Sequence, residues 1–178
     1  DLFNKAGQES SISTDLLETL IVSDARSFAQ DPRFCLSVMA EIACRALSPA
    51  VNDPGTAIDV IGRGVRILST YAQNKSDEIE VKYPSVHVAP LQIKDLLEDF
   101  FLPVARDGAS MREIQIRVLK GLSMLSKGWP GIFAEAAQTL AFETLEHATR
   151  ADHIDSDRYL IKSIYYNLFS GEDSNKKP

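Results

Sequence analysis

Two prolines enclose a short polar corner at residues 45–57, and this corner limits what the chain can fold into more than any other stretch. The segment reads Arg-Ala-Leu-Ser-Pro-Ala-Val-Asn-Asp-Pro-Gly-Thr-Ala. Ser48 precedes a proline, which disfavours the α conformation and ends the helix before it. Pro54 can occupy the first turn of the next helix, where a missing N–H is tolerated, and Asn52 or Asp53 can cap that helix. The stretch therefore predicts a helix, a corner and a second helix.

Apolar residues recur at helical spacing on both sides of the corner. Asp31-Pro32 is a second cap-and-proline start, and the helix that follows carries a broad apolar arc of Phe34, Cys35, Val38, Met39, Ile42, Ala43, Ala46 and Leu47. The helix after the corner carries one apolar stripe. Gly62 and Gly64 weaken that helix by about 1 kcal/mol each relative to alanine, which suggests that a neighbouring backbone approaches closely there.

The rest of the chain adds further helical segments. The spacing predicts a short helix near residues 14–21, one that ends or kinks at Leu102 before Pro103, and others at 111–127, 132–149 and from about 156 onward. Residues 79–88 alternate apolar and polar around a Pro-Ser turn and predict one small β-hairpin. We therefore expect an all-α bundle of about six or seven helices with one hairpin, as a single domain over residues 1–170 with a polar tail at 171–178.

Charge and motif content exclude several classes of function. The net charge of −6 disfavours nucleic-acid binding, and no run of about 20 apolar residues that could span a bilayer is present. Glycine-rich phosphate loops, nucleophile elbows and paired-cysteine zinc motifs are absent from the sequence. Cys35 and Cys44 fall on opposite sides of one predicted helix, so we expect two free thiols. No cofactor is predicted.

Polar side chains near the corner form the first candidate site. They are Arg26, Gln30, Asp31, Arg45, Ser48, Asn52, Asp53 and Thr56. In one interpretation the arginines hold an anion, or the carboxylates hold a divalent cation. In the other, Asp31 and Asp53 cap helices and Arg45 pairs with one of them, so that the corner satisfies itself. An open cleft lined by Arg45 and Asp53 would favour the ligand site.

A second candidate cluster follows the longest predicted helix. His147, His153, Asp155 and Asp157 could hold a metal ion. The alternative is a solvated helix end, because cationic His is favourable in a last turn and Asp in the next first turn.

The last predicted helix carries more apolar surface than one neighbour can cover. Leu160, Ile161, Ile164, Tyr165, Leu168 and Phe169 occupy about half of its circumference, with Tyr159 and Tyr166 on much of the rest. Either this helix lies in the centre of the bundle, or it leaves an aromatic patch exposed and the chain forms a homo-oligomer.

Two blocks of the sequence resemble the signature of a known family. Residues 26–34, with an Arg, a Gln-Asp pair and a Phe, and residues 45–57 together are similar to the bacterial predicted membrane proteins of domain of unknown function 2254. The clear resemblance covers residues 26–68. The family places a small residue after Phe34, where this chain has Cys35, and often a larger apolar residue at the position of Gly55.

The resemblance implies where the whole protein resides. Transmembrane helices would lie upstream in the same protein, which would sit in the bacterial inner membrane with this domain on the cytoplasmic side. We therefore expect a non-catalytic soluble domain that assembles or regulates the membrane part. The alternative is a small-ligand-binding or hydrolytic domain that uses the polar corner around Arg45 and Asp53.

Overall fold

The computed structural model describes residues 26–28, 31–75 and 89–169. These residues form six helices and no strand: α2 (Pro32–Leu47), α3 (Pro54–Gln73), α4 (Ile93–Asp107), α5 (Arg112–Gly128), α6 (Pro130–Arg150) and α7 (Asp155–Phe169). The all-α prediction is confirmed for this part of the chain. The predicted helix at 14–21, the hairpin at 79–88 and the tail at 171–178 lie outside the described residues.

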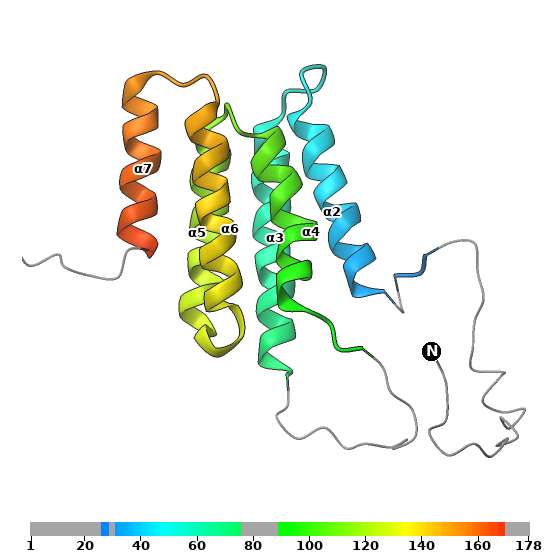
Figure 1. Ribbon diagram of the computed structural model, residues 1–178. Coiled ribbons are helices and arrows are strands. Elements are labelled where there is room, and N and C mark those ends of the chain that lie inside the picture. Colours follow the sequence, from blue (N-terminus) through cyan, green and yellow to red (C-terminus); the bar gives the residue numbers. More distant parts are fainter. Residues whose placement is uncertain (1–25, 29–30, 76–88, 170–178) are drawn as a thin grey trace, which may run out of the picture.

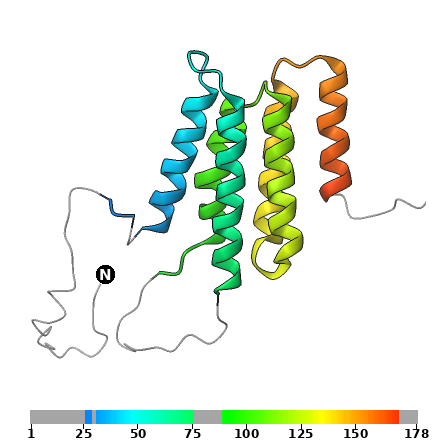
Figure 2. The same cartoon turned by 180° about the vertical axis from the view of Figure 1, so that it is seen from behind.

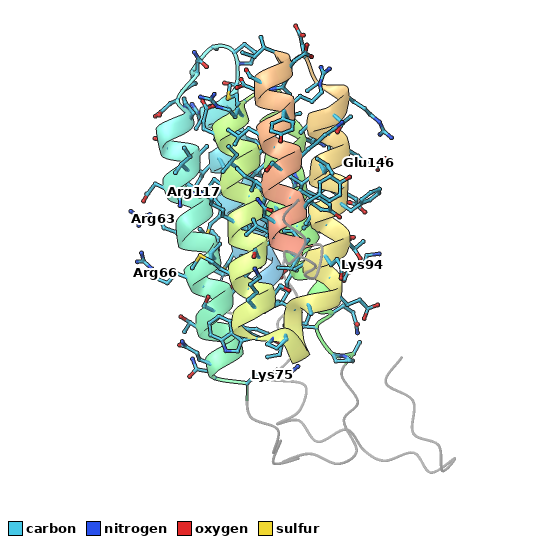
Figure 3. The ribbon with its side chains drawn as sticks, turned by 90° about the vertical axis from the view of Figure 1, so that its left-hand side faces the viewer. Arg63, Arg66, Lys75, Lys94, Arg117 and Glu146 are labelled. Carbon is cyan, nitrogen blue, oxygen red and sulfur yellow. The ribbon has the colours of Figure 1, made fainter. Side chains whose placement is uncertain are left out.

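Successive helices run in opposite directions and form two layers with a helix at each end. In Figures 1 and 2, α4 and α6 lie on one broad face and α3 and α5 on the other. At one end α2 packs against both α3 and α4, and at the other α7 packs against both α5 and α6. Figure 3 looks at the α7 end, where α7 stands in front of α5 and α6. The last helix is thus an end helix, which rules out the alternative that it lies in the centre of the bundle.

The predicted helix starts are confirmed at both caps. Asp31 Oδ1 accepts a hydrogen bond from Phe34 N at 3.0 Å, and Asp53 Oδ1 accepts one from Thr56 N at 3.0 Å, with proline in the first turn of each helix. Each aspartate satisfies an N–H that the first helical turn leaves without a partner. Between α5 and α6 only Trp129 interrupts the helices, because Pro130 starts α6 directly.

Helix α4 continues through Pro103. The prediction that a helix ends or kinks at Leu102 is therefore wrong where it gives an end. Its buried residues lie on both sides of the proline, with Phe100 and Phe101 before it and Val104 and Ala105 after it, all four 0 % exposed. Burial of these four side chains offsets the hydrogen bond that proline cannot donate.

Close packing of α3 against α4 depends on Gly64. A Cβ atom at this position would lie 2.1 Å from Phe100 Cζ, whereas a Cβ at Gly62 would meet nothing within 4 Å. A close neighbour is present at Gly64 as predicted, but it is the buried ring of Phe100 and not the expected backbone. At Gly62 the prediction is wrong.

The inward face of α2 is only partly as predicted. Its buried residues are Leu36, Ala40, Ala43, Ala46 and Leu47, and the last three belong to the predicted apolar arc. Ile42, which the apolar arc placed inside, is 49 % exposed, and Phe34, Val38 and Met39 are only half-buried. Small alanine side chains let an end helix fit between α3 and α4, so part of the larger apolar arc faces outward.

Candidate functional site

The N-terminal end of α2 holds the first group of predicted site residues. Arg26 Nη2 lies 2.7 Å from Asp31 Oδ2, and its guanidinium stands 4.9 Å from the centre of the Phe34 ring. Phe28 stacks on Phe34. The hydrogen bond from Arg26, with the cap bond from Phe34 N, holds the pKa of the Asp31 carboxyl below its usual value. Gln30 lies outside the described residues.

The corner after α2 holds the second group, and its bonds are local. Ser48 Oγ donates to Arg45 O at 2.7 Å, and Asn52 N donates to Ser48 O at 2.8 Å, with Asn52 in the left-handed region at a φ of 49°. Asp53 also accepts from the Thr56 hydroxyl at 2.6 Å, and the bonds from Thr56 lower the pKa of Asp53. The Asp53 carboxylate already occupies the N–H groups that an external anion would use.

The structure does not unite the two groups. Asp31 precedes α2 and Asp53 follows it, and a helix of 16 residues is about 24 Å long. The expected pairing of Arg45 with Asp31 or Asp53 is wrong, because those carboxylates bond to Arg26 and Thr56. Arg45 is exposed, and its guanidinium has no partner among the described residues. The corner is therefore a set of helix caps and turn bonds with one free arginine beside it.

The side chains of the predicted metal cluster bond to different neighbours and do not share a contact. His153 is buried and its Nε2 lies 2.8 Å from Ala109 O, while Asp157 pairs with Arg112 at 2.8 Å. Asp155 is fully exposed, and its nearest cation is Arg158 at 3.9 Å. Across the part of the chain that the structure describes, no three His, Cys, Asp or Glu side chains converge in a way that could hold a metal ion.

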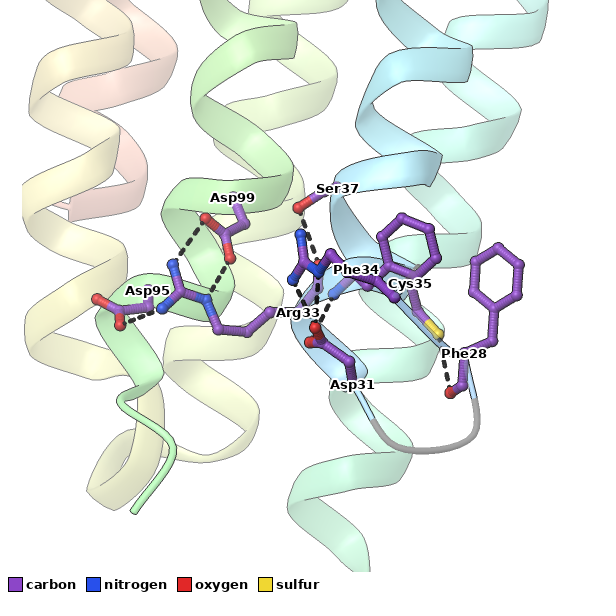
Figure 4. Close-up of polar contacts among 9 residues, drawn as sticks. Phe28, Asp31, Arg33, Phe34, Cys35, Ser37, Asp95 and Asp99 are labelled. Carbon is purple, nitrogen blue, oxygen red and sulfur yellow. Dashed lines mark hydrogen bonds and ion pairs between the residues drawn. The ribbon is translucent and has the colours of Figure 1, made fainter. Parts of the chain in front are cut away.

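Arg33 makes the most extensive ionic contact between two helices in the described residues, and it is absent from the predicted site. Its Nε donates to Asp99 Oδ2 at 2.6 Å, its Nη2 to Asp99 Oδ1 at 3.1 Å and its Nη1 to Asp95 Oδ2 at 2.8 Å (Figure 4). One guanidinium of α2 thus holds two carboxylates of α4, and the bond to Asp99 raises the pKa of Arg33. Asp95 and Asp99 are four residues apart on one helix, so they would repel each other without a nearby cation. This pair of like charges is the sequence signal that could have indicated a cationic partner.

Above this contact, α2 and α4 enclose an open groove of about 520 Å³. Glu41, Cys44, Glu98, Asp99, Arg106 and Asp107 contribute to its lining. Burial, together with a hydrogen bond to Asp107, raises the pKa of the Cys44 thiol to about 12. The thiol therefore stays protonated at neutral pH and is a poor nucleophile or metal ligand.

We expect Cys44 to resist alkylation in the folded chain. In a Cys35→Ser variant, which leaves one thiol, iodoacetamide at pH 8 should react more than a hundredfold (~10²) slower with the folded chain than with the urea-unfolded chain. The raised pKa disfavours the thiolate, so the folded rate should keep rising with pH above 9. Equal rates in the two states would show that the thiol is exposed and ordinary.

An aromatic surface remains on the outer side of α7. Within this helix only Ile161 is fully buried, while Tyr159 is 75 % exposed and Tyr166 56 % exposed. These tyrosines are seven residues apart, so they lie on the same side of the helix. The predicted exposed aromatic patch is confirmed, and we call Tyr159, Leu160 and Tyr166 the α7 surface.

Comparisons with known proteins find short stretches of high identity. Uncharacterized proteins of Mycobacterium bovis and of two strains of Mycobacterium tuberculosis are each 61% identical over 36 residues, which is 20% of this chain and 7% of each relative. The chain thus matches only a small part of these curated relatives. No solved structure matches it significantly. In the described residues, no helix has the length and apolar character needed to cross a membrane.

The family comparison covers more of the chain. The family described as "Predicted membrane protein (DUF2254)" matches residues 2–124, more than half of the sequence and including helices α2 to α4 and most of α5. The relatives carry no assigned activity in their names. The chain belongs to the DUF2254 family of predicted membrane proteins.

Proposed function

We propose that this helical bundle is a non-catalytic assembly domain of a bacterial inner-membrane protein, lies on the cytoplasmic side, and self-associates through the α7 surface. The observation that carries the proposal is the exposure of Tyr159, Leu160 and Tyr166 on an end helix. Tyrosine contributes a large, rigid and partly apolar contact area, and for this reason it is enriched at protein interfaces.

The charged groups described above support an assembly role over catalysis. Asp31, Asp53 and Asp99 each bond to a neighbouring side chain or cap a helix. The Cys44 thiol is held protonated. These contacts position helices, and none of them pairs a nucleophile with a base.

The position of α7 suits an assembly contact. Because α7 packs only against α5 and α6, a second copy can reach its outer side without disturbing the layers of α3 to α6. Two-fold dimers are the commonest assemblies of identical chains, and in such a dimer the same surface contributes from both copies.

Light scattering of the chain at micromolar concentration tests this proposal. We expect a mass of two copies or more of the 19.7 kDa chain, and we expect Tyr166→Glu to dissociate it with an unchanged helical circular dichroism spectrum. A glutamate at a packed interface would have to lose its hydration without a partner.

A matched control uses another exposed apolar residue. Met124 lies on α5 and is 64 % exposed, so Met124→Glu introduces the same charge away from the α7 surface and should leave the mass unchanged. A single-chain mass for the unmodified protein, or equal dissociation by Met124→Glu, would contradict the proposal.

A further inference from the structure

An apolar groove bordered by arginines lies at the opposite end of the bundle from α7. Met39 and Ile42 of α2 and Val60 and Ile67 of α3 line it, together with Arg63 and Arg66, and its volume is about 420 Å³. Ile42 is 49 % and Ile67 46 % exposed. We call these six residues the α2–α3 groove. Its apolar side chains belong in part to the arc of α2 that the fold leaves facing outward.

A polar hollow adjoins this groove and shares two of its arginines. Gly55, Gly62, Arg63, Arg66 and Arg117 contribute to a space of about 270 Å³ between α3 and α5. Gly62 leaves it open, since a Cβ there would meet no atom within 4 Å. Arg63, Arg66 and Arg117 lie on one side of the bundle, and Lys94 and Glu146 lie on the other (Figure 3).

The charge of this region is opposite to that of the chain. The groove and the hollow together are lined by three arginines and a single carboxylate, Asp59, while the chain has a net charge of −6. Arg63 pairs with Asp59 at 2.7 Å. Arg66 and Arg117 are exposed, and their guanidinium groups have no ionic or hydrogen-bonded partner among the described residues. Two guanidinium groups are therefore available to an external anion.

We propose that the α2–α3 groove and Arg117 form a docking surface for the anionic phospholipid headgroups of a bilayer. Phosphate oxygens match the planar fork of donors on arginine. Exposed isoleucines beside cations are the pattern of surfaces that lie in the interface between headgroups and acyl chains. The family to which the chain belongs consists of predicted membrane proteins, so a bilayer is the anionic surface that it would meet. This surface goes beyond the α7 contact and does not depend on it.

Flotation of the 178-residue chain with vesicles tests the proposal. We expect binding to vesicles of phosphatidylcholine with 30 % (roughly one lipid in three) phosphatidylglycerol, weak binding to phosphatidylcholine alone, and loss of binding as salt rises, because exposed charges are screened. The double variant Arg66→Gln/Arg117→Gln should weaken binding about twenty-five-fold, at roughly fivefold for each arginine. Neither substitution leaves a carboxylate without its partner, so the fold should persist.

A matched control separates local charge from net charge. Lys94 on α4 and Arg150 on α6 are exposed and lie away from the groove, so Lys94→Gln/Arg150→Gln makes the same change in net charge. This control should bind within about twofold of the unmodified chain. Ile67→Ser should weaken binding while leaving its salt dependence unchanged, since it removes apolar contact and no charge.

Four results would overturn the proposal. These are equal binding to both vesicle types, equal loss in the control variant, release by inorganic phosphate at constant ionic strength, and a change in oligomer mass caused by the arginine substitutions. The third would assign the arginines to a soluble anion and the fourth to a second copy. Tyr166→Glu should reduce vesicle binding only as far as a single copy binds more weakly than an oligomer. A failure of the α7 proposal would therefore appear in light scattering and not in the effect of the arginine substitutions.

Discussion

Replacing Gly64 with alanine is expected to lower the free energy of unfolding by about 3 kcal/mol. The new methyl group would overlap the ring of Phe100, whose nearest atom is 2.1 Å from the required Cβ position. Phe100 is 0 % exposed and packs edge to face against Phe101, so the ring cannot move into solvent. Urea denaturation followed by circular dichroism measures the change.

Gly62→Ala is the matched control on the same helix. It should stabilise the bundle by about 1 kcal/mol, because alanine is the better helix former and the position is open. Opposite signs at two positions separated by one residue cannot come from helix propensity alone. Destabilisation of equal size at both positions would show that α3 does not pack as described.

The second large effect is expected at Gln115, which is 0 % exposed in α5. Its Nε2 donates to Ala105 O and to Gly108 O, each at 2.9 Å, and so satisfies carbonyls at the end of α4. Gln115→Ala should destabilise the bundle by about 3 kcal/mol, through a cavity and at least one buried carbonyl without a donor. Thermal or urea unfolding provides the test.

A second substitution at this position separates the two causes. Methionine nearly fills the volume of glutamine but donates no hydrogen bond, and it also removes the Oε1 atom that is buried without a partner. Gln115→Met should therefore cost about 1 to 2 kcal/mol. The same change at the exposed Gln138 of α6 should be nearly neutral. No loss in Gln115→Met would mean that the bonds to α4 do not contribute to stability.

Local signals in the sequence predicted the helices well. The Asp-Pro pairs at residues 31–32 and 53–54 identified the starts of α2 and α3, because a cap and its N–H partners lie within one turn. The exposed tyrosines of α7 were also predictable, since one helix can cover only part of another. The hairpin at 79–88 stays a prediction.

The packing of α2 shows why the inward face of a helix was harder to predict. The apolar arc included Phe34, Val38 and Ile42, which are not fully buried, and it left out Leu36 and Ala40, which are. Periodicity measures where apolar residues gather on a helix. It does not say that a neighbour needs small side chains in order to come close, which is the condition that α2 meets between α3 and α4.

The spatial grouping of the candidate site residues was hard to predict for a related reason. Asp31 and Asp53 looked alike in the sequence, but about 24 Å of helix separates them. Arg33 contacts Asp95 and Asp99, which lie 62 and 66 positions later in the chain. A pattern within a few neighbouring residues cannot predict a contact over such a separation in sequence. Likewise, Arg117 joins Arg63 and Arg66 only because α5 packs beside α3.

Pro103 divides α4 into two segments that are attached to different neighbours. Before the proline, Asp95 and Asp99 form ion pairs with Arg33 of α2. After it, the carbonyl of Ala105 and that of Gly108, which follows the helix, accept hydrogen bonds from Gln115 of α5. The proline cannot donate to the carbonyl of Asp99, so α4 is most easily bent between these two attachments. Any change in that bend would move α2, with its outward apolar side, relative to α5 and the α7 end. Helix α4 is therefore, beside α3, one of two helices that connect the two exposed surfaces of the bundle.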